Sequence, residues 1–297
     1  MRGTTTVSPE AVCAVIVTYH PSDDMIAHLS RVRAQVQGIV VVDNGSGEAT
    51  LAALRSAGSS LGFCLIENGD NLGIAEALNQ GVRWVMENGY RWVILFDQDS
   101  KITEDYMRRM FASLAEHPKS ELIASMHPRY VNPGSSSSTK VLRAVDGGPV
   151  RSLTSGALMP TWIFDKIGWF ASEYFIDEVD TEFCYRIRAA GFLIADSSQA
   201  ELVHSIGHPK PFSILGFKCL PTNHSPMRRY YMTRNRIALY RKYVFVFPRW
   251  VVQSAYETSR ETIKCFLTEE ARGLKFRNYL LGTWDGLIGR MGRREGI

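Results

Sequence analysis

Short apolar runs alternate with amphipathic segments along the first hundred residues of the chain. The runs over 11–19, 39–42 and 63–67 are almost free of polar residues, which is typical of strands that are buried on both faces of a sheet. The segments between them have the spacing of apolar residues found in helices. This strand-helix order predicts a parallel sheet with helices on both faces.

The fourth apolar run, Trp92 to Phe96, leads directly into two carboxylates, Asp97 and Asp99. Open α/β sheets bind ligands at the carboxyl ends of their strands, and Asp is seldom buried without a partner. The pair therefore indicates a site for a cation or a ribose. The same residues also suit a turn in which Asp99 or Ser100 caps a helix that begins near Ile102. On this stretch alone, both interpretations stay open.

Further candidates follow the neighbouring runs. The second run ends at Asp43, whose carboxylate suits either hydrogen bonds from a ribose or base, or a turn. After Asn71, small residues recur from Gly73 at the start of the next predicted helix, which would let its N-terminus approach a nucleotide closely. The glycine motifs G-x-G-x-x-G and G-x-x-x-x-G-K-[ST] are absent, which argues against dinucleotide oxidoreductases and P-loop enzymes.

The second hundred residues predict further strands and helices around an acidic cluster. We expect helices over 103–117 and 180–190, a surface loop over 132–139, and strands over 122–126, 152–159 and 192–195. The strand over 152–159 would contain Ser155-Gly156. Four carboxylates stand at the start of the helix over 180–190, namely those of Asp177, Glu178, Asp180 and Glu182. The helix dipole favours anions at this end, but crowded carboxylates also suit a proton acceptor beside a reacting hydroxyl.

The last third of the chain is basic and helical. Residues 225–240 predict a helix with Pro226 in its first turn, and its Arg and Tyr side chains suit either a diphosphate or solvent. Residues 244–290 predict one or two helices that mix aromatic and aliphatic residues with Lys and Arg. This pattern fits an amphipathic helix at a membrane surface, ordinary core packing or a contact between copies of the chain.

Composition and charge sharpen this division. The chain has 297 residues, of which 45% are hydrophobic and 22% charged, as in ordinary globular proteins. Residues 1–227 hold 19 Lys and Arg against 24 Asp and Glu, whereas residues 228–297 hold 15 against 6. The basic end is therefore expected to contact anionic lipid headgroups or a phosphorylated ligand, or to form a solvated surface; we expect no nucleic-acid partner.

Cysteine usage and the apolar runs bear on the compartment. The five cysteines are scattered without a C-x-x-C pair, and the polar N-terminus lacks the apolar stretch of a signal peptide. Both features predict a reducing compartment and a cytoplasmic location. No apolar run reaches 18 residues, so we expect no membrane-spanning helix.

In this order, the motifs resemble those of the family 2 glycosyltransferases with the GT-A fold. The resemblance rests on Thr18-Tyr19-His20-Pro21, Val-Val-Asp43-Asn-Gly-Ser, Asn71-Leu-Gly73-Ile-Ala and Leu-Phe-Asp97-Gln-Asp99-Ser. The last motif, together with Ser225-Pro-x-Arg228-x-Tyr-Tyr231-x-x-Arg234-Asn235, resembles the rhamnosyltransferase branch. The resemblance covers about residues 11–243 and extends more loosely to 290.

The resemblance implies an α/β GT-A nucleotide-sugar-binding fold, with a mainly parallel mixed sheet flanked by helices. The catalytic domain would span 1–227, with a donor-binding half over about 11–100 and an acceptor half over about 101–227. A basic amphipathic helical region would follow over 228–297.

The resemblance also assigns roles, to which we add the Arg and Tyr residues of the helix after 225 as ligands of the diphosphate. Donor binding would involve Thr18, Tyr19, Asp43, Asn71, Gly73, Asp97, Arg228, Tyr231 and Arg234. A divalent cation, Mg²⁺ or Mn²⁺, would be held by Asp97, Asp99 and His204. Asp180 would be the catalytic base, and Asp177 and Glu178 are the alternatives if the motif is shifted.

The implied activity is inverting, metal-dependent transfer of L-rhamnose from dTDP-L-rhamnose. The acceptor would be a hydroxyl of a cell-surface polysaccharide, an O-antigen or a lipid-linked glycolipid precursor. Three alternatives are kept: a transferase that uses a UDP- or GDP-linked sugar, a catalytically impaired nucleotide-sugar-binding protein, and a nucleotidyltransferase, although that class would carry a Gly-rich basic loop after the first strand. We expect a cytoplasmic protein, peripheral on the inner face of the plasma membrane, and leave open whether it forms a homo-oligomer.

Overall fold

The structure, a computed structural model, divides into two compact units. The described residues are 12–22, 24–131, 153–203, 212–214, 217–219 and 223–297. The sheet unit holds Met1–Ala171 and Phe183–Ser205, and the helical unit holds Ser172–Glu182 and Ile206–Ile297. The surface loop expected over 132–139 and the predicted metal ligand His204 lie outside the described residues.

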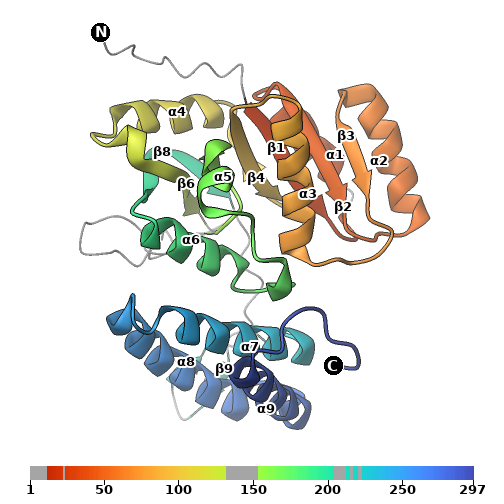
Figure 1. The fold of residues 1–297 in the computed structure, drawn as a ribbon. Coiled ribbons are helices and arrows are strands. Elements are labelled where there is room, and N and C mark those ends of the chain that lie inside the picture. Colours follow the sequence, from red (N-terminus) through yellow and green to blue (C-terminus); the bar gives the residue numbers. More distant parts are fainter. Residues whose placement is uncertain (1–11, 23, 132–152, 204–211, 215–216, 220–222) are drawn as a thin grey trace. The chain divides into compact units, whose positions relative to one another are not determined.

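The sheet unit is built on one mixed sheet (Figure 1), whose strands within the described residues lie in the order β3-β2-β1-β4-β7-β6-β8-β5. Their bounds are β1 Val12–Thr18, β2 Gly38–Asp43, β3 Cys64–Glu67, β4 Trp92–Asp97, β5 Lys101–Ile102, β6 Ile123–Val131, β7 Leu158–Pro160 and β8 Leu193–Val203. β1 pairs in parallel with β2 and β4, whereas β7 is antiparallel to β4 and β6. The predicted mixed α/β sheet is confirmed.

Helices cover both faces of the sheet. Those assigned to the sheet unit, wholly or in part, are α1 Met25–Arg33, α2 Glu48–Leu61, α3 Ile74–Glu87, α4 Tyr106–Glu116, α5 Trp162–Ile167 and α6 Val179–Ala189. Side chains of β1 alternate between the faces. Ile16 packs with Leu29 of α1, whereas Val15 lies so close to Gly81 of α3 that a Cβ at Gly81 would collide with it. Because β1 is covered on both faces, its sequence is apolar throughout.

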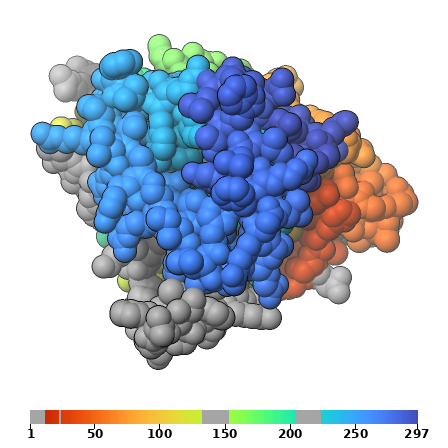
Figure 2. Space-filling view, turned by 90° about the horizontal axis from the view of Figure 1, so that it is seen from below, coloured from red at the N-terminus to blue at the C-terminus, as the bar shows by residue number. Residues whose placement is uncertain are grey.

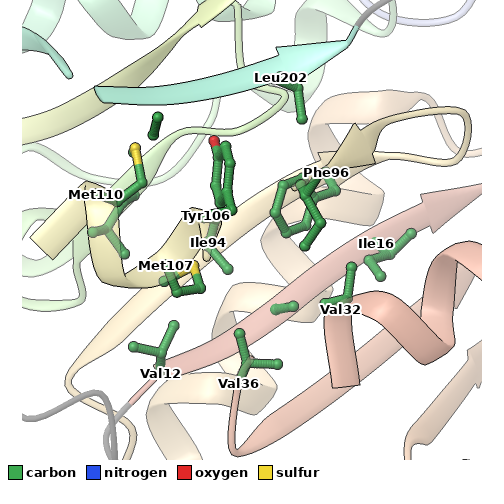
Figure 3. Close-up of a cluster of buried hydrophobic side chains, with 14 of the residues drawn as sticks. Val12, Ile16, Val32, Val36, Ile94, Phe96, Tyr106, Met107, Met110 and Leu202 are labelled. Atoms are coloured by element: carbon green, nitrogen blue, oxygen red, sulfur yellow. The ribbon is translucent and has the colours of Figure 1, made fainter. Parts of the chain in front are cut away.

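The main core lies between the sheet and the helices α1, α2 and α4 (Figure 3). The labelled side chains in Figure 3 are Val12, Ile16, Val32, Val36, Ile94, Phe96, Tyr106, Met107, Met110 and Leu202. Burial of a side chain of this size stabilises the fold by about 1.5–3 kcal/mol. This core fixes the strands whose carboxyl ends hold the predicted site residues.

The helix expected after β4 begins later than predicted. Residues Lys101–Ile102 form β5, which pairs antiparallel with β8, and α4 begins at Tyr106. Asp99 and Ser100 therefore do not cap a helix near Ile102, and that interpretation was wrong. Ile102 is buried opposite Leu202 in the core, so tertiary pairing overrides the local helical pattern.

Two strand predictions also need correction. The strand expected over 152–159 is only Leu158–Pro160, and Ser155-Gly156 forms part of the turn before it. Gly156 has a φ of 80°, and an added Cβ would lie 2.7 Å from the hydroxyl of Tyr106, so the turn requires glycine. The short strand expected over 192–195 is the first part of β8, which continues to Val203 beside β6.

The helical unit contains α7 Pro226–Tyr243, α8 Pro248–Thr268 and α9 Arg272–Ile288, together with the hairpin of β9 Phe212–Ile214 and β10 Phe217–Cys219. As predicted, Pro226 stands in the first turn of α7, whose N-cap Ser225 accepts a hydrogen bond from the backbone of Arg228. Gly282 and Gly286 of α9 face the backbone of α7, where any Cβ would lie within 3 Å of a carbonyl oxygen. No helix in the described part of the chain combines the length and apolarity needed to cross a membrane.

Candidate active site

The carboxyl ends of three neighbouring strands bring predicted donor residues together. In the parallel pairing of β1 with β2, Thr18 stands beside Asp43, and in the pairing of β1 with β4, Val17 stands beside Asp97. The Thr18 hydroxyl donates a hydrogen bond to Oδ2 of Asp43 at 2.9 Å. Both side chains are buried. This edge of the sheet is where α/β folds bind ligands.

Asp43 organises the turn that follows β2. Its Oδ1 accepts hydrogen bonds from the backbone N–H groups of Gly45 and Ser46, at 3.2 and 2.8 Å, and the Ser46 hydroxyl donates to Oδ2 at 2.6 Å. A carboxylate offers about four acceptor positions, and Thr18 and the turn together use four. These contacts support the turn interpretation of Asp43, and its role toward a donor stays a prediction.

Asn44, which sequence reasoning missed, connects two loops at the same edge. Its side-chain oxygen accepts hydrogen bonds from Asn68 and from the backbone of Leu72, and its amide donates to Oδ1 of Asn71 at 3.1 Å. The same Asn71 oxygen accepts the backbone N–H of Gly73, which has a φ of 87° just before α3. The structure thus brings the predicted residues Asn71 and Gly73 into one loop network. The Asp-Asn-Gly-Ser sequence, rich in turn formers, was the available signal.

Tyr19 and the acidic stretch after β4 lie on the same rim. The backbone N–H of Tyr19 donates to the side-chain oxygen of Gln98 at 2.8 Å. The residue Tyr19 is 46% exposed, which leaves it accessible to a ligand. Gln98, which stands between the two predicted metal ligands and was not itself predicted, therefore holds the loop after β1 against the loop after β4.

Asp97 and Asp99 differ in their surroundings. Asp97 is partly buried and donates its backbone N–H to the hydroxyl of Ser155 at 3.3 Å, whereas Asp99 is exposed. The Ser100 hydroxyl, which is fully buried, lies 2.5 Å from the same Ser155 hydroxyl. Ser155, another residue that the sequence did not indicate as functional, thereby anchors the segment that holds both carboxylates.

The two carboxylates provide part of a divalent cation site. Mg²⁺ and Mn²⁺ prefer oxygen ligands and commonly use one or two carboxylates together with phosphate oxygens and water. Asp97 and Asp99 match that donor set. Within the described residues, no three His, Cys, Asp or Glu side chains form a metal-binding group. The third predicted ligand, His204, is not among those residues.

In the helical unit, three of the four clustered carboxylates pair with cations of α7. Asp177 accepts two hydrogen bonds from Arg228, at 2.5 and 3.3 Å. Glu178 pairs with Arg236, and the fully buried Glu182 pairs with Lys242 at 2.7 Å. The three ion pairs are therefore Asp177–Arg228, Glu178–Arg236 and Glu182–Lys242. They offset the mutual repulsion that the sequence pattern implies.

Asp180 stands in the first turn of α6 and is partly buried. Its Oδ1 accepts the backbone N–H of Thr181 at 2.7 Å and faces the Thr181 hydroxyl at 3.4 Å. The hydrogen bond to Asp177 raises the pKa of the Arg228 guanidinium. Asp180 is therefore placed beside an acidic segment that is fixed by ion pairs.

The three predicted donor residues of α7 have internal contacts. Arg228 binds Asp177, and the Tyr231 hydroxyl accepts the backbone N–H of Arg294 at 2.9 Å. Arg234 is fully buried and donates to the backbone carbonyls of Glu173 and Tyr174, at 3.2 and 3.1 Å. Any contact of these residues with a donor stays a prediction.

The predicted site residues thus fall into two groups. Those that the structure places in the sheet unit are Thr18, Tyr19, Asp43, Asn71, Gly73, Asp97 and Asp99, and those in the helical unit are Asp180, Arg228, Tyr231 and Arg234. Each group is held by its own hydrogen-bond network.

Two solved structures share the fold. The crystal structure of TarS 1–349 from Staphylococcus aureus in complex with UDP superposes with a TM-score of 0.55 at 15% identity, covering 96% of this chain and 94% of that chain. The mannosyltransferase PcManGT from Pyrobaculum calidifontis, in complex with GDP-Man and Mn²⁺, has a TM-score of 0.55 at 13% identity. The match covers 96% of this chain and 90% of that chain. The architecture therefore resembles that of GT-A glycosyltransferases, as predicted.

Sequence comparison agrees with the fold. The dTDP-rhamnosyl transferase RfbF of Shigella flexneri is 30% identical over an alignment 296 residues long, which covers 95% of this chain and 97% of that protein. The low-salt glycan biosynthesis hexosyltransferase Agl10 of Haloferax volcanii is 25% identical over an alignment 211 residues long, which covers 64% of this chain and 66% of that protein. Residues 13–165, more than half of the chain, match the family described as glycosyl transferase family 2. The chain therefore belongs to glycosyl transferase family 2.

Proposed function

We propose that this glycosyltransferase transfers L-rhamnose from dTDP-L-rhamnose to a hydroxyl of a saccharide or lipid-linked acceptor. The observation that carries the proposal is the 30% identity to a dTDP-rhamnosyl transferase over 97% of that protein's length. The acceptor would be a precursor of a cell-surface polysaccharide, an O-antigen or a glycolipid. A UDP- or GDP-linked donor is the alternative, since relatives of the same fold bind UDP and GDP-Man.

The donor nucleotide would lie at the carboxyl ends of β1, β2 and β4. The exposed ring of Tyr19 suits stacking against a base. Thr18, Asp43 and the Asn71 network would shape the floor of this pocket, because their hydrogen bonds hold the loops that surround it. Gly73 before α3, which has a positive φ and no side chain, would let the backbone approach the nucleotide closely.

Asp97 and Asp99 would hold a Mg²⁺ or Mn²⁺ ion, with His204 as a further ligand. The fit rests on two carboxylates one residue apart, of which Asp99 is exposed. A bound ion of this kind stabilises the negative charge of the departing nucleoside diphosphate. The Ser155 hydrogen bonds would keep both carboxylates in place.

Asp180 would accept the proton of the acceptor hydroxyl in a single displacement that inverts the anomeric carbon. A base in this role must present a carboxylate oxygen to the hydroxyl as the new bond forms. Both oxygens of Asp177 bind Arg228, and Glu178 is buried against Arg236. We assign the proton transfer to Asp180, which stands in the first turn of α6 at the position that the family resemblance gives to the base.

The exposed face of α8 and α9, which are drawn in blue in Figure 2, would meet an anionic membrane surface, where a lipid-linked acceptor resides. Large apolar side chains of both helices are exposed, namely Val252, Tyr256, Ile263 and Leu267 of α8 and Leu274, Phe276, Leu280, Trp284, Leu287 and Ile288 of α9. Exposed arginines of the same helices are Arg249, Arg260, Arg272 and Arg277. Apolar side chains flanked by cations are typical of helices that lie in the headgroup region of anionic lipids.

A radiolabel assay tests the proposed reaction. The chain is incubated with Mn²⁺, membranes of its source cells and dTDP-L-rhamnose labelled in the sugar. We expect label to enter the glycolipid or polysaccharide fraction and the new linkage to have the anomeric configuration opposite to that of the donor. Label that enters only from a UDP- or GDP-linked sugar would establish the alternative donor class instead.

A further inference from the structure

The segment before α6 has an unusual backbone. Phe175, Asp177 and Glu178 all have positive φ angles, of 63°, 63° and 62°. Residues with a Cβ rarely adopt such conformations, which persist only where the surroundings enforce them. Within four residues, the chain therefore stores strain directly before the helix that holds Asp180.

One side chain of α7 binds most of this segment. The amide nitrogen of Asn235, which is fully buried, shares its two N–H groups among the backbone carbonyls of Tyr174, Ile176 and Asp177, at 2.9, 2.8 and 2.8 Å. These three carbonyl oxygens all belong to the four-residue stretch 174–177, which overlaps the residues with positive φ angles. A single amide group thus satisfies carbonyls that helix or strand pairing does not reach.

Arg234 fixes the orientation of that amide. Its Nε donates to Oδ1 of Asn235 at 2.9 Å, so the NH₂ group of Asn235 must face the segment. The other guanidinium nitrogens donate to the carbonyls of Glu173, Tyr174 and Gly292. The guanidinium also lies over the ring of Tyr231, 4.8 Å from its centroid.

Two ion pairs secure the end of the segment. Arg228 binds the side chain of Asp177, and Arg236 binds that of Glu178. Both arginines stand on α7, where Arg228 lies two turns before Asn235 and Arg236 directly follows it. Side chains of one helix therefore hold the backbone and the carboxylates of residues 173–178.

We propose that Asn235 and Arg234 are positioning residues, which hold residues 173–178 in their strained conformation and so set the place of Asp180 at the start of α6. The proposal rests on the proposed function, because it takes Asp180 as the base. Without the amide, the strained residues relax toward negative φ, and the first turn of α6 moves with them. A displacement of about 1 Å of a reacting group can cost on the order of 100-fold in rate.

The test compares Asn235→Ala with a matched control, Asn278→Ala. Asn278 is also fully buried in the helical unit, but its side-chain nitrogen and oxygen have no hydrogen-bond partner among the described residues. Both substitutions remove the same atoms, and only the first removes contacts with the strained segment. Readouts are amide hydrogen exchange over 172–178, kcat, and the affinity for dTDP measured by calorimetry.

We expect Asn235→Ala to speed exchange over 172–178 and to lower kcat by about 10- to 100-fold with unchanged dTDP affinity. Asn278→Ala should change none of these. Exchange at the wild-type rate in Asn235→Ala would overturn the proposal, and so would faster exchange with a wild-type kcat. If the alanine variant fails to fold, Asn235→Ser, which keeps one donor, should give intermediate values in both readouts, and wild-type values would overturn the proposal.

The exchange readout does not depend on turnover. If the wild-type chain transfers no sugar, the proposed function fails. Amide hydrogen exchange over 172–178 still shows whether Asn235 stabilises that segment. If transfer occurs but Asn235→Ala has the kcat of the wild type, the proposed function stands and the positioning role of Asn235 is wrong.

Discussion

At the scale of single residues, the assignment of Asp180 as the base is open to a direct substitution. Asp180→Asn keeps the size of the side chain but removes the proton acceptor, so kcat should fall by about 10²- to 10⁴-fold. Donor affinity, measured by calorimetry, should stay near the wild-type value. The comparison variant is Asp177→Asn, which weakens the pair with Arg228 and should reduce kcat less. Near-normal transfer by Asp180→Asn would refute the assignment.

Asp99 offers a second test at this scale. Its exposed carboxylate is assigned to the divalent cation, so Asp99→Ala should abolish the gain in dTDP affinity that Mn²⁺ produces. Glu87→Ala, which removes an exposed carboxylate at the end of α3 in the same unit, serves as the control. If Asp99→Ala and the wild type bound dTDP equally well in Mn²⁺, the assignment of the cation site to Asp99 would be wrong.

Single residues also mark how far sequence reasoning reaches. The carboxylates after β4 and before α6 could be found because acidic residues at element ends stand out against an apolar pattern. The contacts of Asn235 could not be found from the sequence, because its three partners are backbone carbonyls about 60 positions earlier in the chain. A polar residue on a helix face gives no signal of what faces it in the fold.

At the scale of elements, local pattern and tertiary pairing compete. The first three strands follow from their apolar runs, since each is flanked by helices of ordinary length. β5 has only two residues and forms because it pairs with β8, so no local sequence pattern predicts it. Its presence delays α4 until Tyr106.

The junction of α7, α8 and α9 gives a prediction on stability. The buried Glu269 at the end of α8 binds Lys275 of α9 at 2.8 Å and Arg229 of α7 at 3.3 Å. Burial opposes ionisation, but the hydrogen bonds of Lys275 and Cys265 and the charge of Arg229 lower the pKa of Glu269 to about 2. Glu269→Gln leaves two buried cations without their counter-charge and should cost about 3–5 kcal/mol at pH 7.

The pH dependence of that cost has a defined sign. The folded pKa lies below the ordinary value of 4.5, so the stabilisation is complete above about pH 4.5 and is lost as the pH falls toward 2. The difference in melting temperature between wild type and Glu269→Gln should therefore narrow over that interval. Circular dichroism melts from pH 7 to pH 2.5 measure it, and a difference that stays constant would contradict the ion cluster.

At the scale of the whole molecule, the sequence predicts the parallel half of the sheet better than the other half. β1 to β4 arise from a repeated strand-helix order, whereas β6, β7 and β8 pair across long separations and in both directions. Periodicity identifies elements but does not specify which distant strands are neighbours. The helical character of the basic region over 228–297 was predicted from its charge and its mixture of apolar and basic residues, and this region forms most of α7 and all of α8 and α9.

The exposed face of α8 and α9 predicts binding to vesicles. The full chain should co-sediment with anionic vesicles at low salt, since each basic residue near such a surface contributes about 1 kcal/mol, and binding should weaken as salt rises. Phe276→Glu with Trp284→Glu should reduce binding at least about tenfold, because both exposed side chains enter the headgroup region. Ile26→Glu, an exposed apolar position of α1, should bind as wild type does.

Two outcomes would count against the membrane surface. One is the absence of binding to anionic vesicles at low salt. The other is a dimer in analytical ultracentrifugation that the Phe276→Glu and Trp284→Glu pair dissolves, which would identify the face as a contact between two copies.

The central claim is that this family 2 glycosyltransferase takes its sugar from a dTDP-linked donor. Calorimetric titration of the full chain with dTDP-L-rhamnose, UDP-GlcNAc and GDP-mannose, each with and without Mn²⁺, tests it most directly. We predict that dTDP-L-rhamnose binds at least about tenfold more tightly than the other two, a difference of about 1.4 kcal/mol, and that Mn²⁺ strengthens its binding. Tighter binding of UDP-GlcNAc or GDP-mannose, or no binding of dTDP-L-rhamnose in Mn²⁺, would contradict the account.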